Sequence, residues 1–157
     1  MANPALITEL FEEGVAVVTL NRPDLHNAFD DDLIAKLTRE LKKLEATPEV
    51  KVVVLAANGM SFSAGADLNW MKRTAGYSRE QNLKDAMALA ELMRTLNGLA
   101  MPTVARVQGP AFGGGVGLVA CCDIAIAART ATFALSEVRI GLIPAVISPY
   151  VVAAIGE

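Results

Sequence analysis

The sequence predicts an α/β fold that forms one domain over residues 1–157. Short β-branched runs alternate with amphipathic segments of helical period, and Gly and Pro residues mark the boundaries between them. The length suits a single domain with a sizeable core, and no internal repeat divides it. Strands that alternate with helices in this way favour repeated βα units.

The expected elements of the first half follow from local patterns. Ala5–Phe11 and Val15–Leu20 read as two strands of a hairpin. Asp30–Asp32 suit a helix N-terminus, because carboxylates cap free N–H groups and complement the helix dipole. Leucines spaced by four and three residues give that helix one apolar stripe, and Pro48 ends it. The continuous apolar run Val52–Ala57 is typical of a strand covered on both faces.

The second half continues the alternation. Its expected elements are a helix over Arg79–Asn97, a strand over Thr103–Gln108, short strands over Asp123–Ala128 and Ala131–Leu135, connecting chain over Ser136–Ile143, and a helix from Pro144 to Ile155. Gly98 can end the first of these helices. The last dozen residues are almost entirely apolar, so we expect that a C-terminal part of the protein is missing here.

Composition and charge exclude several classes of protein. Hydrophobic residues make up 53% of the chain, but no apolar run approaches the ~18–20 residues of a membrane span. Met1–Pro4 lacks the pattern of a secretory signal. The net charge of −3 and the absence of basic clusters argue against nucleic acid as a partner. The adjacent Cys121 and Cys122 have neither a metal spacing nor a disulfide pattern. We therefore expect a cytoplasmic protein with no metal, membrane or nucleic-acid partner.

Three consecutive glycines, Gly113–Gly115, follow a predicted strand and open an apolar run. Glycines lose much backbone freedom on folding, so such a run indicates a sharp turn, close packing or a close approach to a ligand. A helix that begins at this loop also presents backbone N–H groups without helical partners. A tight connection without a ligand explains the glycines equally well.

A second loop of small residues, Ser63–Asp67, also follows a predicted strand. Ligands of α/β sheets bind at the carboxyl ends of strands. One N–H group from each loop could therefore hold a common oxygen, which is the arrangement of an oxyanion hole. The alternative is that Ala64–Ala66 only packs tightly.

An oxyanion hole needs an acid or base beside it, and Glu137 is the outstanding candidate. It stands among apolar residues, where a carboxyl group is suited to proton transfer. The alternative is an exposed glutamate, or one paired with Arg139, at the end of a strand. His26 is the only histidine and is interpreted as an incidental loop residue.

Four segments together carry a family resemblance. They are Asn21–Pro23 with Asn27–Phe29, Phe62–Leu68, Gly113–Gly115 with Cys121–Asp123, and Ser136–Pro144. In residues and in order they resemble the enoyl-CoA hydratase/isomerase (crotonase) superfamily, and the resemblance covers essentially the whole chain. Within that superfamily, Ala66–Lys72 and Ile143–Tyr150 are most similar to bacterial methylglutaconyl-CoA hydratases of leucine degradation.

The resemblance implies a fold, an activity and a site. The fold would be a spiral of repeated ββα units that assembles as a homotrimer or hexamer through C-terminal helices. The activity would be the reversible hydration of an enoyl-CoA thioester, with coenzyme A entering only as part of the substrate. The N–H groups of Ala66 and Gly114 would hold the thioester oxygen as it becomes an enolate, and Glu137 would be the acid and base. The residues expected along the CoA arm are Leu25, Ala64, Ala66, Asp67, Leu68 and Gly114.

One position departs from the family pattern, because typical two-carboxylate hydratases carry a glutamate where this chain has Gly117. Hydration needs one group to activate water and one to supply a proton to the α-carbon. Glu137 could perform both tasks in turn, or another group could assist. Alternatively, the protein is a single-base isomerase, or an acyl-CoA-binding relative without activity.

The sequence also bears on two classes of ligand, dinucleotides and dicarboxylic acyl chains. Gly115–Ala120 fits a loose dinucleotide-binding pattern, but the helix that follows is too short for a Rossmann crossover. A dicarboxylic acyl chain would need a cation near its far end, and the candidates are Lys72, Arg73 and Arg139.

Overall fold

The computed structural model describes residues 3–156. Met1, Ala2 and Glu157 lie outside the described residues, and so do the expectations that rest on them. Within the described chain, no helix combines the length and the apolar character that a bilayer crossing requires. No group of three or more His, Cys, Asp or Glu side chains in that same part of the chain is arranged to hold a metal ion.

The main sheet has five strands in the order β1-β2-β3-β4-β6. Their bounds are Leu6–Leu10 (β1), Val15–Leu20 (β2), Val52–Ala57 (β3), Thr103–Val107 (β4) and Ile124–Ala127 (β6). β1 and β2 form the expected antiparallel hairpin, and all other neighbours are parallel. A small second sheet pairs β5 (Ala111–Phe112) in parallel with β7 (Phe133–Ala134). The predicted α/β class with parallel βα units is confirmed.

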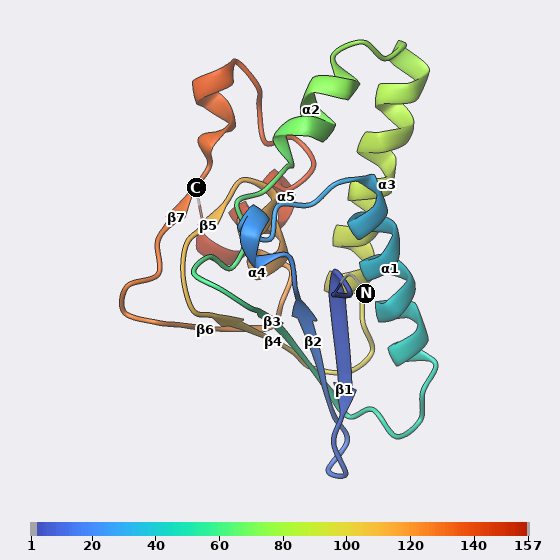
Figure 1. Cartoon of the computed structure of the whole chain (residues 1–157). Coiled ribbons are helices and arrows are strands. Elements are labelled where there is room, and N and C mark those ends of the chain that lie inside the picture. The colour runs from blue at the N-terminus through green and yellow to red at the C-terminus, as the bar shows by residue number, and fades with distance from the viewer. Residues whose placement is uncertain (1–2, 157) are drawn as a thin grey trace.

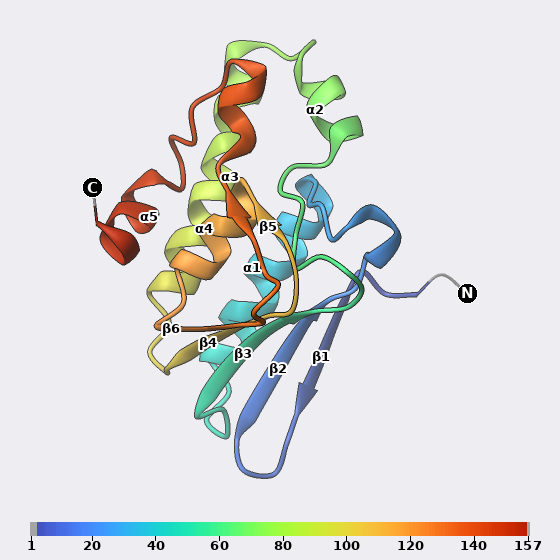
Figure 2. The same ribbon diagram turned by 90° about the vertical axis from the view of Figure 1, so that its left-hand side faces the viewer.

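The helices gather over one side of the main sheet (Figure 1, Figure 2). The α-helices are α1 (Asp31–Glu45), α2 (Leu68–Thr74), α3 (Arg79–Asn97), α4 (Gly114–Ala120) and α5 (Ser148–Ile155), and the 3-10 helices are η1 (Pro23–Leu25) and η2 (Ser136–Ile140). In both views α2 and η2 lie at the same end of the molecule.

The one-sided cover corrects the expectation for β3. Val53 and Leu55 point into the helical layer and are buried, whereas Val52 and Val54 on the opposite face are only half-buried. The continuous apolar run predicted cover on both faces, and in the described chain the face of Val52 and Val54 is covered only in part, at Ala56, which is buried. A continuous valine run does not distinguish a strand covered on both faces from a strand covered on one face, because valine also packs well on a half-buried face.

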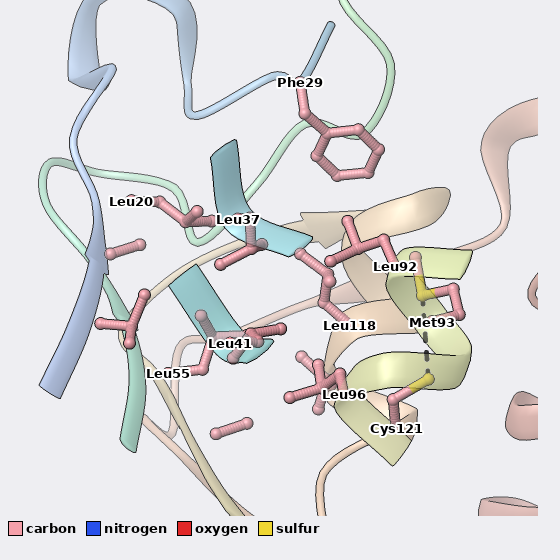
Figure 3. Packing of buried hydrophobic residues seen from close by; sticks show 14 of the residues in the cluster. Leu20, Phe29, Leu37, Leu41, Leu55, Leu92, Met93, Leu96, Leu118 and Cys121 are labelled. Carbon is pink, nitrogen blue, oxygen red and sulfur yellow. Dashed lines mark hydrogen bonds between the residues drawn. The ribbon is translucent and has the colours of Figure 1, made fainter. Parts of the chain in front are cut away.

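The core lies between the sheet and helices α1, α3 and α4. The leucine stripe of α1 is buried as predicted, and Leu37 and Leu41 pack toward Leu96 of α3 and Leu118 of α4 (Figure 3). Cys121 is buried with its Sγ 3.7 Å from Sδ of Met93. Burial raises the pKa of both Cys121 and Cys122 to about 12, so neither thiol is a nucleophile at neutral pH.

Helix boundaries agree with the sequence where a capping residue marks them. Asp30 accepts a hydrogen bond from the N–H of Leu33 and begins α1. Ser78 and Gln81 form a reciprocal capping box that begins α3. Gly98 ends α3 as expected.

Three local expectations were wrong. The segment Leu68–Thr74 forms α2, which no predicted element covered. Ser136–Ile140, expected as connecting chain, forms the 3-10 helix η2. The last helix begins at Ser148 and not at Pro144, because Pro149 occupies its first turn and the preceding residues form tight turns.

Candidate active site

A cavity of about 440 Å³ lies at the carboxyl ends of β3 and β4. Its walls come from both small-residue loops, from α2, from η2 and from the segment that leads into α5. The lining residues are Phe29, Ala64, Gly65, Ala66, Leu68, Trp70, Met71, Leu89, Gly113, Gly114, Ser136, Glu137, Arg139, Ile140, Leu142, Ile143, Pro144, Ala145, Val146 and Ile147. The volume is in the range of small-molecule sites, and most of the wall is apolar.

Parallel pairing of β3 with β4 brings the two loops together. Ser63 then forms an isolated parallel bridge with Ala111, and the N–H of Phe112 donates to the Ser63 carbonyl. Gly65 has a φ of 83°, and a Cβ at this position would lie 2.8 Å from the Phe112 carbonyl oxygen and 3.5 Å from the Gly114 nitrogen. Only glycine therefore allows this backbone to approach the start of α4 so closely.

The same geometry leaves two N–H groups at the cavity without internal partners. The parallel bridge between Phe29 and Ala66 uses the carbonyl of Gly65 and the N–H of Asp67, and so does not use the N–H of Ala66. Gly114 is the first residue of α4, where a backbone N–H has no partner within the helix. No acceptor within residues 3–156 engages either group. Ala66 and Gly114 are therefore available as donors to a ligand oxygen.

Glu137 lies against Gly113, the residue before the Gly114 donor. Its Oε1 would be 2.9 Å from a Cβ built on Gly113, so the carboxylate rests against the glycine loop. Its Oε2 is buried and has no hydrogen-bond partner among the described residues. The structure also shows no ion pair between Glu137 and Arg139 in that part of the chain, which was the alternative arrangement. A buried carboxylate oxygen without a partner is suited to contact a ligand.

The structure places the residues expected along the CoA arm in two groups. Ala64, Ala66, Leu68 and Gly114 line the cavity. Asp67 and Leu25 do not, so their contacts with coenzyme A remain predictions. Asp67 is buried and accepts hydrogen bonds from the N–H groups of Asn69 and Trp70 at the start of α2.

The motif around Asn27 has a structural role. Its side chain donates to the carbonyls of Asn58 and Ser61 and accepts from the N–H of Arg22. These bonds hold Phe29 in the cavity wall, where its N–H donates to Gly65. His26 contacts Ser61 through Nδ1 at 3.0 Å and does not line the cavity, which agrees with the interpretation of an incidental residue.

Several wall residues were absent from the expected site. Trp70 and Met71 lie on α2, which was not predicted, and Leu89 comes from α3. The only usable signal was Asp67 followed by the chain's single tryptophan, since an aspartate before an apolar run marks a helix N-terminus. The segment Leu142–Ile147 has no sequence pattern that predicts a cavity wall. Its residues are recognised as wall residues only in the folded chain, where they line the cavity.

Gly117, one helical turn after Gly113 on α4, faces Ile147. A Cβ at this position would lie 2.3 Å from Cγ2 of Ile147 and 3.2 Å from Cε of Met93. Gly117 and Ile147 are both buried. The space in front of Gly117 is therefore filled by an apolar side chain, and a larger residue there would displace Ile147.

We expect Gly117→Ala to lower the free energy of unfolding by about 1–3 kcal/mol, the usual cost of overpacking a core. Ile147→Ala removes the Cγ2 contact. The nearest atom to a Cβ at position 117 is then Cβ of residue 147, at 2.9 Å. The cost of Gly117→Ala should therefore be smaller in the Ile147→Ala background, and urea unfolding of the four proteins measures this coupling. Strictly additive effects would show that the two residues do not compete for the space.

Comparisons with known proteins agree with this site. Residues 10–157 match the family model described as enoyl-CoA hydratase/isomerase. A putative enoyl-CoA hydratase from Thermus thermophilus is 40% identical over 147 residues, which are 93% of this chain and 58% of that protein. The chain thus spans well under two thirds of the length of this relative.

Two solved structures are similar over almost the whole chain. A putative enoyl-CoA hydratase/isomerase (crotonase) from Legionella pneumophila has 51% identity and a TM-score of 0.94, covering 98% of this chain and 59% of its own. An enoyl-CoA hydratase from Shewanella pealeana has 50% identity and a TM-score of 0.95, covering 98% of this chain and 58% of its own. The chain has the crotonase fold and belongs to the enoyl-CoA hydratase/isomerase family.

Proposed function

We propose that this protein catalyses the reversible hydration of an enoyl-CoA thioester through an enolate held by an oxyanion hole. The observation that carries the proposal is the cavity, because its lining includes Ala66 and Gly114, whose N–H groups have no acceptor among the described residues, and Glu137, whose Oε2 has no partner there. The donors act where negative charge develops on the thioester oxygen. In this proposal the Glu137 carboxylate moves the proton.

Glu137 is the only carboxylate among the cavity-lining residues of the described chain. In the proposed mechanism it accepts a proton from water while the water oxygen bonds to the β-carbon of the substrate. The electron pair of the double bond moves to the thioester, and the Ala66 and Gly114 N–H groups hold the resulting enolate oxygen. Glu137 then returns the proton to the α-carbon, so that one water has been added.

We propose methylglutaconyl-CoA as the substrate, and therefore a role in leucine degradation. The segments Ala66–Lys72 and Ile143–Tyr150 support this, because they carry the finer resemblance and together contribute nine residues to the cavity wall. Coenzyme A enters as part of the substrate. Assembly as a homotrimer or hexamer and a cytoplasmic location belong to the same proposal.

Single-base isomerisation is the second candidate, and the packing of Gly117 against Ile147 favours it. That contact leaves no room for a second carboxylate on α4. In an isomerase, Glu137 would remove a proton from one carbon of the acyl chain and return it to another, with no water added.

Product analysis with a panel of enoyl-CoA thioesters tests the proposal. Hydration predicts loss of the conjugated thioester absorbance together with a product heavier by one water. A product of unchanged mass with a shifted double bond would establish isomerisation. Binding of acyl-CoA in calorimetry without any turnover would support the acyl-CoA-binding alternative.

A further inference from the structure

We propose that Arg139 binds a carboxylate at the far end of the substrate's acyl chain and so selects short dicarboxylic acyl groups. This inference rests on the proposed function and deepens it. The cavity wall contains two charged side chains among the described residues, Glu137 and Arg139. The first is assigned to proton transfer, which leaves Arg139 as the cation of the site.

The charge of Arg139 is not neutralised by the protein. No carboxylate of the described chain lies within ion-pair distance of it, whereas Arg22 pairs with Asp30 at 3.0 Å and Arg73 pairs with Asp31 at 2.9 Å. Arg73 and Lys72 lie on α2 but do not line the cavity. Of the three candidate cations, Arg139 is thus the one at the site and without an ion-pair partner.

The surroundings of Arg139 strengthen its attraction for an anion. The cavity wall that Arg139 lines also contains Ile140, Leu142 and Met71, so the cavity beside it is largely apolar. A charge-assisted hydrogen bond between guanidinium and carboxylate is short and can be bidentate, and low polarity around it increases its strength. Arg139 is itself exposed, so a ligand can reach it without first displacing a protein partner.

Glu137 and Arg139 both belong to η2 and both line the cavity. Glu137 and Arg139 are two residues apart on a 3-10 helix, which corresponds to a rise of about 4 Å. In the proposed mechanism the carbons that exchange protons lie next to Glu137, and Arg139 lines the same cavity, so we expect a carboxylate on a short acyl chain to reach Arg139. An acyl chain of that kind is a short dicarboxylic acid and not a long fatty acid.

Coenzyme A offers a second source of negative charge, because its phosphates could also bind Arg139. We assign Arg139 to the acyl carboxylate, because Arg139 lies on η2 together with Glu137, the proposed proton-transfer residue. Ile140, an apolar residue of the cavity wall, follows Arg139 on the same helix. The experiment separates the two sources by using a short enoyl-CoA with a terminal carboxylate, its methyl ester, and free coenzyme A.

The test compares the wild type with Arg139→Gln and with Lys72→Gln as a matched control. The control removes a neighbouring cation that does not line the cavity. We expect Arg139→Gln to raise KM for the carboxylate substrate roughly 10- to 100-fold, as for a lost hydrogen bond to a charged group. The value of kcat, the KM for the methyl ester and the calorimetric Kd of free coenzyme A should change little. Lys72→Gln should leave all four quantities unchanged, and Arg139→Lys should recover part of the lost affinity.

The other outcomes overturn the inference in distinguishable ways. Equal weakening of both substrates and of free coenzyme A would assign Arg139 to a phosphate. Unchanged kinetics in Arg139→Gln, with an active wild type, would remove Arg139 from substrate recognition and leave the proposed function intact. A wild type that converts neither thioester would overturn the proposed function and the inference with it.

Discussion

The Glu137→Gln variant should lose turnover by about 10²- to 10⁴-fold, the range attributed to a positioned general acid or base. The amide has nearly the shape of the carboxyl group but cannot accept and return a proton. Glu137 is the only carboxylate in the described cavity wall, so no other wall residue of the described chain offers a carboxylate in its place. Steady-state kinetics of enoyl-CoA hydration measures the loss, and calorimetry with coenzyme A should show binding close to that of the wild type.

Ser136→Ala is the matched control, since Ser136 is the preceding residue on η2 and also lines the cavity. It should retain most of the activity and the wild-type unfolding midpoint. If Glu137→Gln kept most of its turnover while remaining folded, the proton would be moved by a different group and the proposed mechanism would be wrong.

The Gly114→Pro variant should lower kcat by about 10²- to 10³-fold, as is typical for removal of one oxyanion-hole donor. Proline deletes the N–H group, and its backbone conformation suits the first residue of a helix such as α4. However, any Cβ at position 114 would lie 2.4 Å from Cζ of Phe29. A loss of activity by Gly114→Pro alone would therefore mix an electrostatic effect with a steric one.

Two further variants separate these effects. Phe29→Leu removes the ring atoms that a Cβ at position 114 would meet, and Gly114→Ala adds the Cβ but keeps the N–H group. In the Phe29→Leu background, the ratio of kcat between Gly114→Ala and Gly114→Pro then reports the contribution of the amide. A ratio near one would show that the Gly114 N–H does not hold the enolate oxygen.

The two predictions also bear on the choice between hydration and isomerisation. Both reactions pass through an enolate, so both require the Ala66 and Gly114 donors and a carboxylate. They differ in whether water reaches the β-carbon next to Glu137. Ile147 fills the space in front of Gly117 on α4, and in the proposed hydration Glu137 positions the water.

Much of the fold could be predicted because its signals are local. The leucine stripe of α1 and the aspartates at its start, the β2 and β3 runs and the hairpin are each contained in a few consecutive residues. The capping residue Asp67 was also visible, but it was interpreted as a CoA contact. A helix of seven residues spans too few turns to show a helical period in the sequence, so the pattern does not predict α2.

The sequence by itself determined the α/β alternation and the two small-residue loops, and it led to the prediction that Glu137 is the acid and base. Glycine runs and an isolated glutamate among apolar residues are readable without long-range contacts. Only the tertiary structure decided that Arg139, and not Lys72 or Arg73, faces the cavity, that Gly117 is closed off by Ile147, and that Asp67 caps α2. Those facts depend on which residues from distant segments occupy the same volume. Such packing is settled by all the contacts of the core at once and leaves no mark in the local pattern.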